Sequence, residues 1–415
     1  MSDSIIRADD ICKYFEMSRG LIARLFEEPR QIKAVDGVDL DIDRGDIIGL
    51  VGESGCGKST LGRVLLGLEM PTSGTVEFKG EPLSAKSKDD LRRMRKEAQM
   101  LFQNPYQTLN PRLTILDNLR EPLKIHKIGS RETRHERIHQ GLVDVELNPD
   151  EILDRFPTEL SGGQRQRVSI ARAFLLDPDF IVADEPVSML DVSIKKDMLD
   201  LLEANLEKND ACMLYISHDL STVGHICDYI HVMYLGKIVE RGPTNAVIED
   251  PAHPYANLLV QAIPSIDVDR ERERIRGLGE VPSSETVPTG CRFHPRCPKI
   301  IAPDDWPADQ STWKRAIDLI ADIRDGSALT EIDDDTADTE IVDAVLTDYF
   351  GTSDRPSVID ERLRTVIAGS VNGTGETALE HWPYSSVCQD DRPPEYDIEG
   401  DHHARCYLLA DPTAD

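Results

Sequence analysis

The sequence lacks any apolar run approaching the roughly 20 residues that a membrane-spanning helix needs, and its start, Met1 to Asp10, is polar and acidic. We therefore expect a chain that is neither secreted nor membrane-spanning by itself. Basic residues are scarce, with 47 Lys and Arg against 76 Asp and Glu, so the formal net charge of the 415 residues is -29. Such a surface repels nucleic-acid phosphates, which argues against general nucleic-acid binding. It suits a salt-rich cytoplasm, and we expect a halophilic host, with an acidic protein of a mesophile as the alternative.

A glycine-rich segment follows the apolar run Ile47–Val51 and has the pattern G-x-x-x-x-G-K-S. A strand before it and an apolar helical stripe after it, formed by Leu61, Val64, Leu65 and Leu68, are the context that a phosphate-binding loop requires. The loop's backbone N–H groups and the helix start attract the α- and β-phosphates of a nucleotide. Lys58 is predicted to reach the β- and γ-phosphates, and the Ser59 hydroxyl to bind Mg²⁺. The predicted loop residues are Gly52, Glu53, Ser54, Gly55, Cys56, Gly57, Lys58, Ser59 and Thr60.

A second apolar run, Phe180–Ala183, ends in two carboxylates, Asp184 and Glu185. Ligands of parallel α/β sheets sit at the carboxyl ends of the strands, so these side chains are expected beside the phosphates. Asp184 is predicted to hold Mg²⁺, and Glu185 to be the base that orients the attacking water.

Between these motifs lies a helix start in which Ser161 and Gln164 have the spacing of a capping box. The two residues between them, Gly162 and Gly163, allow a phosphate to approach the backbone closely. Taken alone, this segment would be an ordinary helix cap.

The phosphate loop precedes the segment Leu160–Arg167, and the strand that ends in Asp-Glu follows it. In this order, the segment resembles the signature of the ABC ATPase family. The resemblance implies an α/β P-loop NTPase fold with a RecA-like core, an antiparallel β subdomain and a helical signature subdomain. It also implies two ATPase domains that face each other head to tail, each signature completing the partner's ATP site. Intact Lys58, Ser161, Glu185 and His218 disfavour a catalytically weak member of such a pair. The resemblance also assigns Gln103 to the Q-loop, near Mg²⁺, Asp191 to the D-loop, and His218 as the switch histidine. It implies that Phe15, with Tyr14 beside it, stacks on adenine, although an insertion near 19–30 disturbs the spacing.

A narrower resemblance points to the second ATPase subunit of oligopeptide and dipeptide importers. It is carried by Leu101–Pro105, Leu109–Arg112, Glu185–Ser188, Met233–Gly236 and His253–Tyr255. It implies a subunit that energises peptide import, or import of nickel or another small solute, at the cytoplasmic face of the membrane. The implied partners are a second ATPase subunit in a heterodimer, two permease subunits and an extracellular solute-binding protein. A non-transport ABC ATPase of DNA repair or translation is the alternative from another class, but its usual coiled-coil arms and basic surfaces are not visible in the sequence.

Four of the eight cysteines fall in the last third of the chain, with the spacings C-x5-C and C-x17-C around an insertion at about 299–387. This arrangement resembles the family's C-terminal motif, which implies a 4Fe-4S cluster, with zinc or reduced unliganded thiols as alternatives. We therefore expect a nucleotide-binding domain over residues 1–264 and a C-terminal extension over 265–415. The four cysteines are Cys291, Cys297, Cys388 and Cys406.

The insertion is rich in Asp, including Asp333–Asp335, and two apolar stripes predict that it is partly helical. An adaptation to salt and a regulatory or partner-binding role are both open interpretations. A charged stretch over 267–276 is expected to form a helical linker or a solvated face. The helical stripes are Ala316, Ile317, Leu319, Ile320 and Ile323, and then Ile341, Val342, Val345 and Leu346.

Overall fold

The computed structural model describes residues 4–16, 31–263, 281–282, 287–325, 328, 338–351, 355–371 and 382–410. The insertion near 19–30, the charged stretch 267–276, the Asp333–Asp335 run and the expected domain boundary at 264/265 lie outside these residues. The chain divides into two compact units. The first comprises Met1–Ile266 with Asp397–Ala404, and the second comprises Asp267–Tyr396 with Arg405–Asp415.

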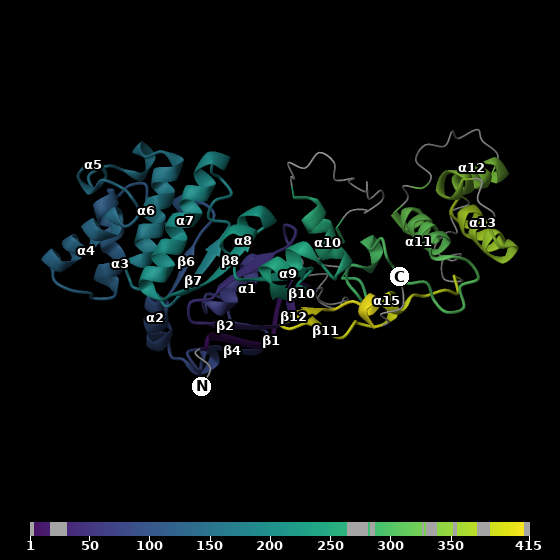
Figure 1. Cartoon of the computed structure of the whole chain (residues 1–415), viewed down its shortest axis with the longest axis horizontal. Coiled ribbons are helices and arrows are strands. Elements are labelled where there is room, and N and C mark those ends of the chain that lie inside the picture. The colour runs from purple at the N-terminus through teal and green to yellow at the C-terminus, as the bar shows by residue number, and fades with distance from the viewer. Residues whose placement is uncertain are drawn as a thin grey trace, which may run out of the picture. The chain divides into compact units, whose positions relative to one another are not determined.

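The first unit is built around an eight-stranded sheet (Figure 1). Neighbouring strands pair in parallel from β9 through β3, β8 and β7 to β6, whereas β10 is antiparallel to both β9 and β12. Strands β3 and β8 are buried along their whole length, which is why they appear in the sequence as continuous apolar runs. In spatial order the strands are β11 (Tyr396–Glu399), β12 (His402–Ala404), β10 (Lys237–Pro243), β9 (Tyr229–Tyr234), β3 (Ile47–Val51), β8 (Cys212–Ser217), β7 (Phe180–Asp184) and β6 (Ala98–Leu101).

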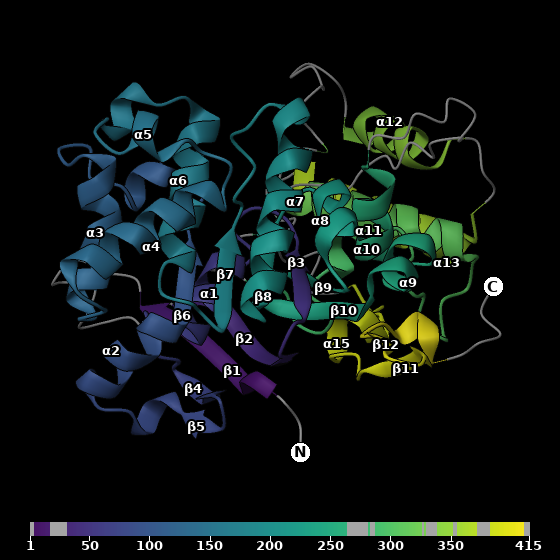
Figure 2. The ribbon, with the colours of Figure 1, turned by 60° about the vertical axis from the view of Figure 1, so that its left-hand side comes forward.

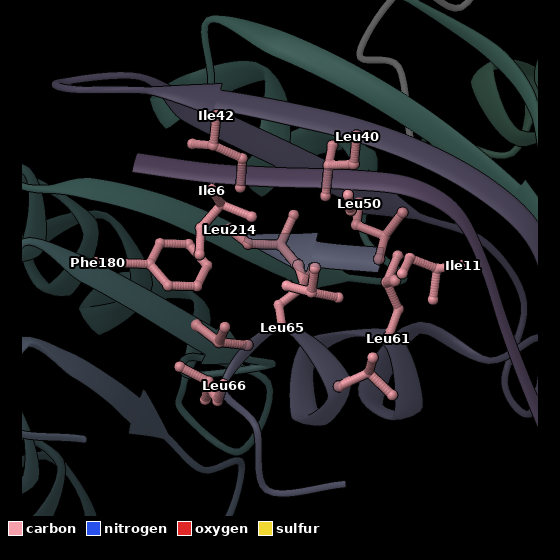
Figure 3. Close-up of a cluster of buried hydrophobic side chains, with 14 of the residues drawn as sticks. Ile6, Ile11, Leu40, Ile42, Leu50, Leu61, Leu65, Leu66, Phe180 and Leu214 are labelled. Atoms are coloured by element: carbon pink, nitrogen blue, oxygen red, sulfur yellow. The ribbon is translucent and has the colours of Figure 1, made fainter. Parts of the chain in front are cut away.

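A second sheet is antiparallel and lies across the helix that follows the phosphate loop. Its strands, in order, are β2 (Gln31–Asp43), β1 (Ser4–Glu16), β4 (Ser73–Phe78) and β5 (Glu81–Pro82). Figure 3 shows Leu61 and Leu65 of that helix, α1 (Lys58–Leu65), in one apolar cluster with Ile11 and Leu40 of this sheet and Leu214 of the main sheet. These apolar side chains are almost fully buried, so the core directly supports the start of α1.

The predicted apolar stripe of α1 is wrong at its fourth member. Leu61, Val64 and Leu65 are fully buried, but Leu68 is 45% exposed. The helix ends at Leu65, and Gly67 takes φ +58, a left-handed conformation that terminates helices. Leu68 therefore lies beyond the helix and cannot share its buried face.

Helices α3 to α6 lie together next to β6 and β7 (Figure 2). We call this group of four helices the helical part of the first unit. The core, the antiparallel sheet and this helical part are the three parts that the sequence predicts. The helices of this unit are α1, α2 (Lys88–Glu97), α3 (Ile115–Ile125), α4 (Arg131–Val143), α5 (Pro149–Ile152), α6 (Gly162–Phe174), α7 (Val192–Asn209), α8 (Leu220–Ile226), α9 (Thr244–Glu249) and α10 (Pro254–Gln261).

The second unit contains helices within the segment that the sequence marks as an insertion. They are α11 (Gln310–Asp325), α12 (Asp338–Phe350) and α13 (Ser357–Val371). The short helix α15 (Val387–Asp390) follows the insertion. Both predicted helical stripes are confirmed, because each of their nine side chains is at most 9% exposed. Aromatic rings add to this core, with Trp306 packing edge-on against Trp313 and Tyr384. The insertion thus buries an apolar core of its own, despite its acidic composition.

Within the described ranges, no helix combines the length and the apolar composition that crossing a membrane would require.

Candidate nucleotide site

The site is assembled at the carboxyl-terminal edge of the main sheet. Strand registers place the ends of four parallel strands side by side: Val51 pairs with Ser217, Asp184 with Ile216, and Leu101 with Ala183. The segments that follow these strands therefore meet at one edge, which is where parallel α/β sheets bind their ligands.

The phosphate-binding loop can follow its path only with glycine at two positions. Gly57 has φ +111, and a Cβ there would lie 1.9 Å from the carbonyl oxygen of Ala34 on β2. Gly52 has φ +156, and its Cβ would lie 2.1 Å from the carbonyl oxygen of Met233 on β9. The loop is therefore pressed against the backbones of both sheets, and any side chain would push it away.

Lys58 begins α1 and is only 6% exposed. Its Nζ donates to the carbonyl oxygens of Gly52 and Glu53, at 2.7 and 2.9 Å. The ammonium group is thus held within the curl of the loop by backbone acceptors, where it can exchange these contacts for phosphate oxygens.

Ser59 and Asp184 form a pair of hard oxygen donors. The Ser59 hydroxyl donates to Asp184 Oδ1 at 3.0 Å. Burial raises the pKa of Asp184, and the hydrogen bond from Ser59 offsets part of that rise. Hydroxyl and carboxylate oxygens are the ligands that Mg²⁺ prefers, so this pair fits the metal by its chemistry.

Glu185 lies at the centre of a hydrogen-bonded group. Gln103 Nε2 donates to Glu185 Oε2 at 2.8 Å, and His218 Nδ1 lies 2.8 Å from Oε1. Gln103, which was predicted near Mg²⁺, thus bonds to Glu185 and not to the Ser59–Asp184 pair. Each carboxylate oxygen has a fixed partner, which locks the side chain in one orientation.

The backbone of Glu185 is also unusual, because its φ of +48 lies in the left-handed region. A residue with a Cβ pays about 1–2 kcal/mol for that conformation. Its N–H donates to Ile216 O at 2.9 Å, and the Ser188 hydroxyl donates to its carbonyl oxygen at 3.0 Å. Such strain persists only where the surroundings enforce it and is frequent at functional sites.

The predicted capping box of α6 is confirmed. Gln164 N–H donates to Ser161 Oγ at 3.2 Å, and Ser161 N–H donates to Gln164 Oε1 at 3.0 Å. Ser161 and Gly162 are exposed, and a Cβ at Gly162 would meet nothing within 4 Å. This end of α6 is therefore accessible, and helix N-termini favour anions. Asp191, which precedes α7, is likewise exposed.

The aromatic pair of β1 is divided between two environments. The Tyr14 hydroxyl donates to the buried carboxylate of Asp36, and burial together with that bond raises the pKa of Tyr14. Phe15 is 37% exposed, with Lys13 Nζ 5.1 Å from its ring centroid. Adjacent residues of a strand point to opposite faces, so the two rings cannot share one ligand surface.

One residue at the loop carried no predicted role. Tyr255 of α10 accepts a hydrogen bond from Glu53 N–H through its hydroxyl, at 2.8 Å. The sequence offered a signal in the His253–Tyr255 motif, but nothing in the local pattern indicates which loop its hydroxyl reaches.

The four C-terminal cysteines lie in one neighbourhood of the second unit. Cys291 N–H donates to Cys388 O at 2.8 Å. Burial raises the pKa of Cys297, and so do the nearby thiols of Cys291, Cys406 and Cys388. Among the residues that the structure describes, however, no three or more Cys, His, Asp or Glu side chains are arranged to hold a metal ion. The expected metal centre is not shown.

The fold and the strand-end geometry define a P-loop nucleotide-binding protein. Residues 35–188 match the family described as ABC transporter, and residues 239–302 match the oligopeptide/dipeptide transporter C-terminal region. The di/tripeptide transport ATP-binding protein of Pseudomonas aeruginosa is 44% identical over 296 residues, covering 71% of this chain and 90% of that protein. The oligopeptide transport ATP-binding protein of Bacillus subtilis is 44% identical over 302 residues, again covering 71% and 90%.

A solved structure agrees with the fold of the first unit. A dimeric ATP-binding cassette in a post-hydrolysis state with ADP and Pi superposes with a TM-score of 0.51 at 28% identity, over 58% of this chain and 98% of that one. The chain belongs to the ATP-binding subunits of ABC transporters, in the oligopeptide and dipeptide family. The predicted ABC-type fold is confirmed, and the activity of the family is ATP hydrolysis coupled to transport, which uses ATP and Mg²⁺.

Proposed function

We propose that this chain energises the import of dipeptides and oligopeptides through a separate membrane permease. Two observations together carry the proposal. Gln103 and His218 fix the Glu185 carboxylate, and residues 239–302 match the oligopeptide/dipeptide transporter C-terminal region. The relatives named for di/tripeptide and oligopeptide transport support peptides rather than nickel as the solute.

The roles proposed for the site follow from its contacts. Lys58 and the loop amides bind the β- and γ-phosphates, and Ser59 with Asp184 holds Mg²⁺, with Gln103 at its edge. When bound, Mg²⁺ supplies positive charge that neutralises the phosphate oxygens. Phe15, rather than Tyr14, offers an exposed ring for adenine stacking.

Glu185 is the proposed base for the hydrolytic water. Its two oxygens are oriented by Gln103 and His218, and each carboxylate oxygen keeps a second lone pair that can accept a proton from water. Because the side chain is already fixed, little reorganisation is needed when the water is deprotonated. His218, which is more than half exposed, can then contact the γ-phosphate.

The exposed signature and D-loop residues support a second ATPase subunit as partner. Ser161 and Gly162 at the open end of α6, and Asp191 before α7, are exposed, so another molecule can reach them. We propose a heterodimer with a distinct ATPase subunit, docked on two permease subunits at the cytoplasmic face of the membrane and served by an extracellular solute-binding protein.

Reconstitution of the full transporter in lipid vesicles tests this function. Binding protein loaded with a di- or tripeptide is expected to raise the ATPase rate several-fold over unloaded binding protein, because peptide delivery is coupled to hydrolysis. The matched comparison is the same assay with nickel in place of the peptide. Stimulation by nickel and not by peptide would contradict the assignment of the solute.

We propose a motor over residues 1–264 and an extension over 265–415 that is interrupted by the insertion at about 299–387 and that lends strand β12 to the sheet of the motor. Support for a 4Fe-4S cluster, or alternatively zinc, comes from the closeness of the cysteines. Cys291 N–H donates to Cys388 O, and the thiols of Cys291, Cys406 and Cys388 add to the rise in the pKa of Cys297 that burial causes first. Metal binding would displace the thiol protons and offset that rise. Cys291, Cys297, Cys388 and Cys406 would be the ligands.

Iron and acid-labile sulfide analysis of anaerobically purified protein tests this metal. Iron and sulfide in stoichiometric amounts are expected, and the Cys297→Ala variant should lose most of both. The matched control is Cys212→Ala, since Cys212 is a buried thiol on β8 in the first unit. An iron-free, colourless preparation with stoichiometric zinc would reverse the choice of metal, and one without any metal would refute the centre.

A further inference from the structure

The phosphate-binding loop is held from outside by a buried tyrosine. The Tyr255 hydroxyl accepts the Glu53 N–H at 2.8 Å, and the Tyr255 side chain is 1% exposed. Its ring packs against that of Tyr234, the last residue of β9, with centroids 4.6 Å apart. Because the ring is enclosed on the sheet, the position of its hydroxyl is set by packing.

Glu53 is consequently fixed on both of its peptide groups. Its N–H is bound by Tyr255, while its carbonyl oxygen accepts from Lys58 Nζ at 2.9 Å. Glu53 is the second residue after β3, where the loop leaves the sheet. The bond to Tyr255 therefore sets the direction in which the phosphate-binding amides begin.

The start of α10, which carries Tyr255, is fixed by a buried carboxylate. Glu240 of β10 is 1% exposed and accepts the N–H groups of Ala252 and His253, at 3.0 and 2.7 Å. His253 in turn accepts the Tyr255 N–H through Nδ1 at 3.0 Å. A displacement of Glu240 would thus be passed to the tyrosine within two hydrogen bonds.

Glu240 has a third partner that comes from the far end of the chain. His402 Nε2 lies 2.8 Å from Glu240 Oε1, and His402 is 4% exposed on β12. Strand β12 pairs antiparallel with β10, with Glu240 opposite Ala404. Gly242 permits this approach, because a Cβ there would lie 2.9 Å from His402 Cδ2. Loss of the His402 donor would leave a buried carboxylate with one strong partner fewer, which is costly in a dry environment.

We propose that Tyr255 is a positioning residue for the phosphate-binding loop, and that the C-terminal strand β12 holds it in place through His402 and Glu240. The inference deepens the proposed function, since it rests on this loop binding ATP. It makes nucleotide affinity depend on a histidine more than 340 residues from the loop in sequence.

Two measurements on the full-length chain test the proposal. The first is the Kd for a fluorescent ADP analogue and, by displacement, for ATP. The second is hydrogen exchange at the loop peptide that contains Glu53, measured without nucleotide by mass spectrometry. The variants are Tyr255→Phe, His402→Phe and His402→Gln, with His403→Phe as the control, because His403 of the same strand bonds to the exposed Asp397.

Tyr255→Phe and His402→Phe are expected to raise both Kd values roughly tenfold, the effect of one lost buried hydrogen bond. Both should also speed exchange at the loop peptide. His402→Gln, which retains a donor, and His403→Phe should stay within about twofold of the unmodified chain, since neither removes a partner of Glu240. Unchanged loop exchange in Tyr255→Phe would overturn the positioning role. Equal behaviour of His402→Phe and His403→Phe would overturn the link from β12. If the unmodified chain binds no ATP, the proposed function fails, whereas the exchange experiment still decides this inference.

Discussion

Replacing Glu185 with Gln is expected to reduce ATP turnover of the assembled transporter by roughly 10²- to 10⁴-fold, the range associated with losing a general base. The Gln side chain can still accept from Gln103 and donate to His218, so the group around residue 185 keeps its geometry while losing its basic carboxylate. Affinity for ATP should therefore remain within a few-fold. Steady-state hydrolysis and equilibrium binding of ATP, measured on the same preparation, check both parts.

Glu146→Gln provides the matched control for this result. Glu146 pairs with Arg167 at the surface of the helical part and is 73% exposed, so the same chemical change there should leave turnover unaltered. Turnover of Glu185→Gln equal to that of the control would contradict the role of Glu185 as the base.

Replacing Lys58 with Met is expected to weaken ATP binding by roughly 10- to 100-fold, since charged hydrogen bonds are worth about 1.5–3 kcal/mol. The change also removes the donor that holds the carbonyl oxygens of Gly52 and Glu53, so the loop itself loosens. Titration calorimetry with ATP measures the loss.

Lys208→Met is the control for Lys58→Met. Lys208 is 54% exposed and forms an ion pair with Asp144, away from the sheet edge that carries the loop. Its replacement should not change the Kd for ATP. Undiminished affinity of Lys58→Met would refute the predicted contact with the β- and γ-phosphates. The two site variants thus separate binding from hydrolysis, because one removes a phosphate contact and the other a base.

Features that depend on a short stretch of sequence were predicted well. The capping box of Ser161 and Gln164 has its partners three residues apart, and the buried strand before Gly52 appears as an apolar run. The meeting of Ser59 with Asp184 also follows from a simple rule, that carboxyl ends of parallel strands share an edge.

Features that depend on distant segments could not be predicted in the same way. The spacing of apolar residues predicted that the buried face of α1 extends to Leu68, but the left-handed conformation of Gly67 terminates the helix before it. The partition of Tyr14 and Phe15 depends on Asp36 of the neighbouring strand, which local spacing does not reveal. The contact of Tyr255 with Glu53 joins residues whose proximity results only from the order of strands in the sheet.

The pairing of β12 with β10 also has a consequence for how the protein is made. Strand β10 ends at Pro243, but its neighbour β12 begins only at His402. At about 5–20 residues per second, a ribosome needs roughly 8 to 30 seconds to add the intervening chain. Throughout that interval β10 presents an open sheet edge, which is prone to pairing with other chains. The helical insertion is translated in the same interval, and the nascent chain can close its sheet only after the insertion has left the ribosome.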